Sequence, residues 1–434
     1  MKYLIQFSTL ALAIIASNLA VGQTTKLSLN DAVNYGVKNH PDMQNKILGE
    51  TYAKAQLNET RSFGIPQVSA NLQFVDNIQK QVFVFPVNGT PTPIRVGNTF
   101  VSTGTIQATW LAFDATYFLG LKAAAAFTEL AKIQTNLTKR EVIINVTKSY
   151  HLVLITKENI GLLSQNIKTL ESILFQTEGY YKNGFAEKID VDRLKLALSN
   201  LNTQLDALSD QVQITEKLLK FNMGMPIDTD IELTDNLESL YGLQIENNDL
   251  KADAKQRLEY QLLSNQLTLA RLDKKQFEVG KYPNIVMFGN YQQNNFGDKL
   301  DYSTWYGNSF WGLKVGIPIF SGFNNKAQIV KRNVIIEQTL TGIKMFENAV
   351  NLEASMALTK YQRSLKAIEI QKQNLSLANE ILSTTNAKLK EGVGSNLEIA
   401  NAQQELKTSH TNYLNAIFDL LNAQIEIKKA YGKL

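Results

Sequence analysis

The side chains that most often carry out enzyme chemistry are sparse in this chain. It contains no cysteine and three histidines, His40, His151 and His410, which lie far apart and lack the spacing of metal ligands. No glycine-rich phosphate-binding loop follows a segment with a strand pattern. The acidic residues are spread along the faces of the predicted helices. The sequence therefore predicts a protein that is not an enzyme and that binds neither a cofactor nor a metal.

Two acidic residues occupy matching places in two similar segments. Asp190 lies six residues after Gly184 in YYKNGFAEKIDV, and Glu398 lies six residues after Gly392 in KLKEGVGSNLEI. A carboxylate at the start of a helix offsets the positive end of the helix dipole. Three or more carboxylates gathered around a pore would instead repel one another and favour cations. The residues alone leave both roles open.

The two segments belong to a longer internal repeat. GIPQVSANLQF matches YPNIVMFGNY, IQATWLAFDA matches LKVGIPIFSG, and the two glycines are 208 positions apart. Each half is predicted to contain a helix, a strand, a loop, a strand, a long helix, a glycine turn and a helix. We therefore expect a first repeat at 23–228, an equatorial linker at 229–250 and a second repeat at 251–434.

Four segments alternate between polar and apolar residues, as half-exposed strands do. They cover 66–76, 106–115, 282–291 and 310–320, about the length that a tilted strand needs to cross a bilayer. A single such segment would suit a soluble sheet, but two matched pairs favour a membrane. The positions expected to face lipid are Val68, Leu72, Phe74, Trp110, Ile285, Met287, Leu313, Val315 and Ile317.

Long helices are the stronger signal. From Ala115 to Asn183 the chain has no proline, and one helix over this range would be roughly 100 Å long. Shorter helices, from about Asn30 to Phe63 and from Phe185 to about Met223, together match that length, so we expect them to stack end to end beside it. Leucines at heptad spacing after Gly184 predict coiled-coil packing. The glycines permit the positive φ that ends a helix at the far tip of each helical hairpin.

The N-terminal residues 1–22 predict a secretory signal peptide, because Lys2 precedes an apolar run that ends in small residues. The net charge of +4 is too small to indicate a nucleic-acid partner. Four strands cannot close a barrel, and an open edge in lipid leaves unpaired backbone groups. The chain is therefore expected to form an oligomer with eight or twelve strands.

Several segments in order resemble the TolC family of outer-membrane efflux proteins. They are the opening LSLNDAVNYGVKNHPDM, the segment IPIFSGFNNKAQI, both Lys-x-Gly turns and the terminal KAYG, and the resemblance covers essentially the whole mature chain. It implies an α+β membrane protein, a homotrimer with a twelve-stranded β-barrel (four strands per protomer) in outer-membrane lipid. The barrel would continue into a long periplasmic α-helical barrel with an internal two-fold repeat. The implied function is a passive exit duct for cargo from an inner-membrane pump and a periplasmic adaptor.

The resemblance also implies roles for residues at the tips. The adaptor would dock at Tyr181, Lys182, Gly184, Phe185, Lys390, Gly392 and Val393. A periplasmic gate would use Glu398 and its repeat mate Asp190. The family has a second inward acid three residues later, where this chain has Asn401, with Arg193 in the first half. One acidic ring is therefore expected instead of two.

Two other classes of protein remain open at this point. A soluble periplasmic coiled-coil scaffold would use the same helices without transport, and partitioning into the membrane fraction distinguishes it from a duct. A diffusion porin would share the barrel, but porins have short periplasmic turns. The loops between the strands do not identify the cargo.

Overall fold

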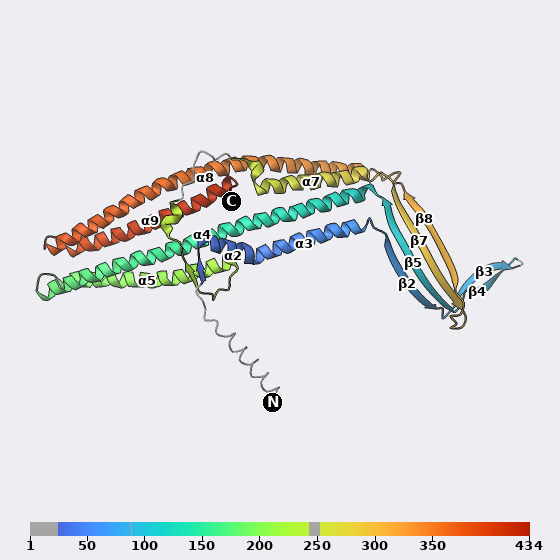
Figure 1. Ribbon diagram of the computed structural model, residues 1–434, viewed down its shortest axis with the longest axis horizontal. Coiled ribbons are helices and arrows are strands. Elements are labelled where there is room, and N and C mark those ends of the chain that lie inside the picture. Colours follow the sequence, from blue (N-terminus) through green and yellow to red (C-terminus); the bar gives the residue numbers. More distant parts are fainter. Residues whose placement is uncertain (1–24, 88, 243–251) are drawn as a thin grey trace, which may run out of the picture. The chain divides into compact units, whose positions relative to one another are not determined.

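The computed structural model describes residues 25–87, 89–242 and 252–434 (Figure 1). The expected signal peptide and the end of the expected linker lie outside the described residues. The chain forms two compact units, and each takes segments from both halves. One unit comprises the described residues up to Ile47 with Ile133–Gln261 and Lys344–Leu434, and the other comprises Leu48–Lys132 and Leu262–Ile343.

The same order of elements occurs twice along the chain. The first half contains β1 (Thr25–Leu27), α2 (Leu29–Asn39), α3 (Pro41–Ser62), β2 (Gln67–Asp76), β3 (Gln81–Val87), β4 (Thr90–Val96), β5 (Phe100–Phe113), α4 (Ala115–Lys182) and α5 (Lys188–Met223). After β6 (Ile231–Leu233) and α6 (Leu237–Tyr241), the second half contains α7 (Leu258–Val279), β7 (Asn284–Gly297), β8 (Tyr306–Gly316), α8 (Asn324–Lys390) and α9 (Asn396–Ala430). The predicted internal repeat is confirmed. The segment between β2 and β5, predicted as a loop, instead contains the β3–β4 hairpin.

The long helices are uninterrupted. α4 has 68 residues and α8 has 67, and each lies beside the shorter helix that follows it (Figure 1). Both turns contain a glycine in the left-handed region, with φ of 79° at Gly184 and 75° at Gly392. An L side chain is disfavoured at such φ values, which explains why glycine stands at both turns.

The predicted single helix from Asn30 to Phe63 is wrong, because it is two helices. Pro41 disfavours a helical conformation at the residue before it, and His40 is extended with φ −60° and ψ 130°. Pro41 itself suits the first position of α3, where an N–H group would have no partner within the helix. At the start of α2, the Ser28 hydroxyl accepts a hydrogen bond of 3.2 Å from the Asp31 N–H.

One hydrophobic core joins both helical hairpins to the segments that lie between the repeats. It includes Val146, Tyr150 and Val153 of α4, Leu219 and Met223 of α5, Leu414, Ile417 and Leu421 of α9, Leu27 of β1, Ile231 of β6 and Leu237 of α6. β1 and β6 pair in parallel. The Tyr150 hydroxyl donates to the Leu27 carbonyl at 2.9 Å and lies 2.8 Å from Asp235 Oδ2. These contacts fix the short elements against the middle of α4.

The second unit contains an antiparallel four-stranded sheet in the order β2-β5-β7-β8. Its strands match the four predicted ones, with different ends. β5 begins at Phe100 and β7 extends to Gly297, while β8 ends at Gly316 instead of Phe320. Pro318 has no N–H for a sheet hydrogen bond, which is consistent with the early end of β8. Ile317 therefore lies just beyond the strand. Among the described residues, none of the helices has the length and apolar character needed to cross a membrane.

Candidate functional sites at the tips, the sheet and the α7–α9 junction

The tips of the two hairpins expose large apolar side chains. Phe185 is 83% exposed and Val393 is 78% exposed, and the Tyr181 side chain is also exposed. Lys182 and Lys390 are exposed at the last positions of α4 and α8. Exposed apolar residues that follow a fixed turn are typical of a surface that contacts another protein.

The structure brings the two hairpins together behind these tips. Leu170, Ile173 and Leu194 of the first hairpin form one core cluster with Leu389 and Ile399 of the second. The Thr177 hydroxyl also donates to Asn396 Oδ1 at 3.3 Å. The two hairpins therefore pack on each other just behind the tips that carry the predicted docking residues.

Asp190 and Glu398 each occupy the third position of a helix. Asp190 Oδ2 accepts a hydrogen bond of 3.3 Å from the Glu187 N–H, whereas the Glu398 N–H donates to Ser395 Oγ at 3.2 Å. These positions support the helix-start role for both acids. The Glu398 carboxylate is exposed and is not the capping group, so it is the freer of the two for another role.

Arg193 and Asn401 follow one turn later, and both are exposed. Asn401 borders a cavity of about 570 Å³ between α8 and α9, whose lining includes Asn374, Gln404 and Ser409. Its lining is polar around Asn401, the position at which the family has its second inward acid. Whether these side chains face a pore stays a prediction.

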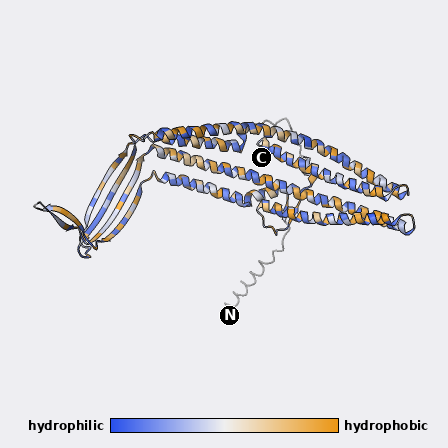
Figure 2. Cartoon of the chain, turned by 180° about the vertical axis from the view of Figure 1, so that it is seen from behind, coloured by the Kyte–Doolittle hydropathy of each residue, from blue (hydrophilic) through white to orange (hydrophobic). Residues whose placement is uncertain are grey.

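The strand register groups the positions predicted to face lipid. Trp110 pairs with Met287, which pairs with Leu313, and directly paired residues of antiparallel strands share a face of the sheet. The same face carries Val68, Leu72, Phe74, Ile285 and Val315. The other face carries polar residues that include Gln67, Ser69, Asn71, Gln107, Thr109, Asn290, Gln292 and Lys314. Polar and apolar residues alternate along the strands (Figure 2). Contact of the apolar face with lipid stays a prediction.

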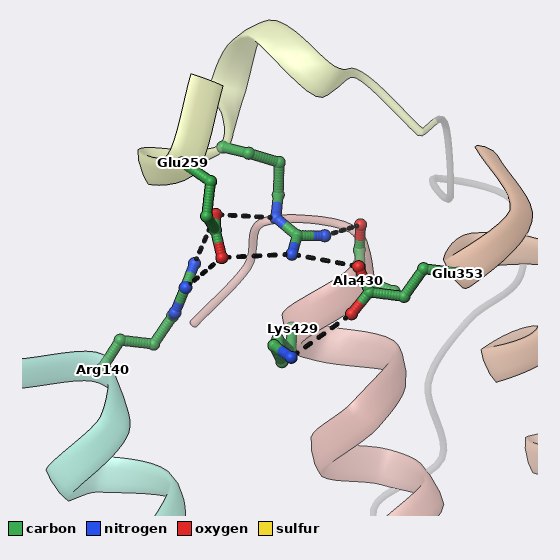
Figure 3. Close-up of polar contacts among 6 residues, drawn as sticks. Arg140, Glu259, Glu353, Lys429 and Ala430 are labelled. Carbon is green, nitrogen blue, oxygen red and sulfur yellow. Dashed lines mark hydrogen bonds and ion pairs between the residues drawn. The ribbon is translucent and has the colours of Figure 1, made fainter. Parts of the chain in front are cut away.

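A buried ion network lies where the end of α9 meets the start of α7 (Figure 3). The Arg257 side chain is 2% exposed, and its Nη1 donates to the Ala430 carbonyl at 2.9 Å. Its Nη2 donates to Glu353 Oε2 at 3.2 Å, and its Nε lies 3.4 Å from Glu259 Oε2. Arg140 of α4 binds Glu259 through both terminal nitrogens, and Lys429 lies 3.4 Å from Glu353. The network thus joins four helices.

The network changes the acidity of Glu259. Burial alone would raise the pKa of its carboxyl group, but hydrogen bonds from Arg140 and Arg257 outweigh burial and lower the pKa to about 2. A lowered pKa means that the folded state binds the proton less well than the unfolded state does. The stabilisation is therefore fully present above the usual pKa of 4.5 and is lost as the pH falls towards 2.

The repeat relates this junction to a different one in the first half. His40 and Asp42 lie 217 positions before Arg257 and Glu259, the offset that also relates the starts of α3 and α7. At the first junction, a Cβ added to Gly224 would lie 2.8 Å from the His40 Cα and 3.0 Å from the Asn39 carbonyl oxygen. The first junction is thus closed by backbone contact and the second by ion pairs.

Sequence reasoning missed the ion network because its members are distant in the chain. The repeat offset could have placed Arg257 and Glu259 at a helix start. Nothing local indicates that Arg140 and Glu353 reach the same point. The three histidines are not brought together, and burial lowers the pKa of His151 to about 4. Across 25–87, 89–242 and 252–434, no group of three or more His, Cys, Asp or Glu side chains could hold a metal ion.

Comparisons with known proteins agree with this architecture. The family model described as "Outer membrane efflux protein" matches residues 266–433. Nodulation protein T of Rhizobium leguminosarum bv. trifolii is 20% identical over 324 residues, which cover 73% of this chain and 68% of that protein. The outer membrane protein VceC of Vibrio cholerae superposes with a TM-score of 0.74 at 14% identity, covering 93% of this chain and 96% of VceC.

A second solved structure gives the same result. The open state of the MtrE outer membrane channel of Neisseria gonorrhoeae superposes with a TM-score of 0.74 at 15% identity, covering 93% of this chain and 88% of MtrE. The α+β TolC-like fold expected from the sequence is confirmed, as is the location in the outer membrane with a periplasmic helical barrel. The matching family consists of transport channels and not of enzymes. Residues 266–433 thus match the outer membrane efflux protein family, and together with the shared fold this match supports the expected function, an outer-membrane exit duct of a tripartite efflux or secretion system.

Proposed function

We propose that this duct receives its cargo through a periplasmic adaptor that docks on the two helical tips. An inner-membrane pump supplies the energy, and the duct conducts passively. The observation that carries this proposal is the repeated tip, in which a turn with a left-handed glycine is followed by an exposed apolar side chain, Phe185 or Val393. Burial of an exposed aromatic or aliphatic side chain contributes about 1.5–3 kcal/mol to an interface.

The division of labour along the chain is proposed to follow the repeat. Once residues 1–22 are removed, the repeats at 23–228 and 251–434 would each supply one tip and two barrel strands. The linker at 229–250 would belong to a belt around the helices. The repeated order of elements and the packing of β6 and α6 against α4 and α9 support this division.

The gate is proposed to be a ring of Glu398 side chains, with Asp190 in a lesser role. Three copies of an exposed carboxylate near one axis would attract cations and hinder anions. The Asp190 carboxylate already accepts the Glu187 N–H, so Glu398 is the better candidate. Arg193 and Asn401 stand where a second acidic ring would otherwise be, and they would limit the gate to one ring.

The apolar face of the sheet is proposed to contact outer-membrane lipid, with the polar face lining the channel. Trp110, Met287 and Leu313 share the first face in paired register. Leu72 on the same face is 93% exposed in the protomer. An apolar outer band and a polar interior are the pattern of membrane β-barrels.

The docking proposal is tested by replacing both tip side chains. Phe185→Ser combined with Val393→Ser should raise accumulation of a fluorescent efflux substrate to the level of cells that lack the protein. The trimer should still be present in the outer membrane. Phe221→Ser is the matched control, because its ring is also exposed but lies at the opposite end of α5. Unchanged efflux in the double variant would contradict docking at the tips.

A further inference from the structure

The β3–β4 hairpin is apolar on both of its faces. Phe83 pairs with Ile94 and Val84 pairs with Pro93, so alternate residues point to opposite sides of the two-stranded sheet. The first face contains Val82, Val84 and Pro93, with Arg95 opposite Val82, and the second contains Phe83, Phe85 and Ile94, with Thr92 opposite Phe85. The large apolar side chains among these are between 41% and 62% exposed in the protomer. Arg95 is the one charged residue from Gln81 to Val96.

Polar contacts fix the base of the hairpin to the sheet. Lys80 Nζ lies 2.6 Å from Asp298 Oδ1, and the Thr99 N–H donates to the same oxygen at 3.0 Å. The Asn77 N–H donates to the Thr99 carbonyl at 2.7 Å. The Lys80 and Thr99 contacts lower the pKa of Asp298 to about 2, which keeps it charged at neutral pH. The hairpin therefore leaves the sheet at a defined place.

An apolar two-stranded hairpin of this kind is expected to pack against another surface. Isolated hairpins are at best marginally stable in water, and contiguous apolar surface is typical of a contact with another surface. One cover on one face would not suffice, because both faces are apolar. In a trimer each hairpin has two neighbours, which supply one surface for each face.

The dimensions allow the three hairpins to meet. Three copies of the four-stranded sheet give twelve strands. At a spacing of about 4.8 Å and a tilt of about 40°, their barrel has a radius of roughly 12 Å. The seven residues of β3 span about 24 Å. A hairpin that folds over the mouth therefore reaches the barrel axis and both neighbours.

The backbone of the hairpin argues against burial in lipid. A two-stranded sheet leaves unpaired N–H and C=O groups along its outer edges, and each costs several kcal/mol in hydrocarbon. Pro91 and Pro93 also cannot donate to an additional strand, so a partner must bind through side chains. Side-chain packing between copies satisfies both conditions.

We propose that the three β3–β4 hairpins pack on one another over the outer mouth and restrict the duct there. The first face of one hairpin contacts the second face of the next, and a head-to-tail contact of this kind closes under three-fold rotation. This inference rests on the proposed duct function. It adds a barrier at the barrel mouth that is separate from the gate at the helical tips.

Disulfide trapping tests the contact, since the chain has no cysteine of its own. Val84→Cys combined with Phe85→Cys places one thiol on each face. Oxidation of isolated outer membranes should then yield covalent trimers on a denaturing gel. Val82→Cys combined with Val84→Cys is the matched control, because both thiols share a face, and it should remain monomeric on the same gel.

Conductance tests the consequence for transport. Phe83→Ser combined with Phe85→Ser should raise the single-channel conductance of the purified trimer at least two-fold. Tyr302→Ser combined with Trp305→Ser removes a similar aromatic pair from the β7–β8 loop and should leave conductance unchanged. These two rings also lie against each other, with centroids 6.5 Å apart.

Three results would overturn the inference, and they are distinguishable. The variant with one thiol on each face could form an intact trimer on a native gel and still give no cross-link. That result would contradict the contact between hairpins but not the duct function. So would quenching of a dye on Val84→Cys by brominated lipid, because it would place the hairpin in the membrane. Protein that is monomeric on the native gel would overturn the duct proposal, and the closure with it.

Discussion

Arg257 is almost completely buried, and its charge is compensated by Glu259, Glu353 and the Ala430 carbonyl. Moving a charge out of water costs free energy, so a buried ion pair stabilises the fold little more than a pair of apolar side chains of similar size would. Removing one partner is different, because it leaves an uncompensated charge in the interior. Loss of the Glu259 charge should have the largest effect, because this carboxylate compensates both Arg140 and Arg257.

Replacing Glu259 with an uncharged residue of similar size should have a large effect on stability. Glu259→Gln should lower the free energy of unfolding by about 3 kcal/mol, measured as a lower melting temperature of the detergent-solubilised trimer. Between pH 4.5 and 2 the variant should lose less stability than the wild type, because the carboxyl group with a pKa of about 2 is gone.

A surface pair provides the control for this substitution. Glu129 lies 3.2 Å from Lys132, and both side chains are at least half exposed. Such pairs contribute about 0–1 kcal/mol, so Glu129→Gln should leave the melting temperature nearly unchanged. Equal effects of the two substitutions would show that the buried network does not stabilise the junction.

The gate proposal makes a prediction about ion selectivity. Glu398→Gln removes the charge but keeps the size of the side chain, and the start of α9 keeps its Ser395 cap. In a planar bilayer the variant should conduct better and prefer cations less than the wild type. Glu129→Gln, which removes an exposed acid of α4 far from the tips, should behave as the wild type. Identical selectivity of all three proteins would remove Glu398 from the gate.

At the scale of the elements, the two junctions show what a repeat preserves and what it changes. Both place the end of one helix against the start of another, and they are related by 207 positions between the helix ends (430 − 223) and 217 between the helix starts (258 − 41). The first uses Gly224, whose φ of 68° and missing side chain allow close contact with His40. The second has room for Arg257 and its partners. The same repeated order of elements therefore contains two helix junctions with different contacts.

A pair of glycine substitutions tests the close contact at the first junction. Gly224→Ala meets both the unfavourable positive φ and a backbone 2.8 Å from the new Cβ. Gly392→Ala meets the φ penalty alone, about 1–2 kcal/mol, because nothing lies within 4 Å of its Cβ position. Gly224→Ala should therefore lower the melting temperature clearly more than Gly392→Ala. A similar decrease in both would mean that α5 and α3 are loosely joined.

Local patterns account for the elements that the sequence predicted correctly. Alternation along β2 and β8 and the glycines between α4 and α5 and between α8 and α9 are signals within a few residues. The break at Pro41 also has a local signal, because proline disfavours a helical conformation at the residue before it, although residues 30–63 were expected to form one helix. The β3–β4 hairpin was missed because its prolines are typical of loops, although they are compatible with a strand edge.

At the scale of the whole molecule, the resemblance predicted more than the physics of one chain could. Open strand edges at β2 and β8 require partners in a membrane, yet the residues alone do not choose between eight and twelve strands. The ion network that joins Arg140, Arg257, Glu353 and Lys429 depends on the packing of four helices. Such contacts between distant segments have no local signature and had to come from the structure.

Three copies of this chain should form one continuous duct through the outer membrane. Single-particle electron microscopy of the protein extracted from the outer-membrane fraction tests it most directly. A trimeric duct should appear as a hollow three-fold particle, with twelve strands in the detergent belt and a helical tube about 100 Å long, the length of α4. A soluble monomer, or a particle without a central channel, would contradict it.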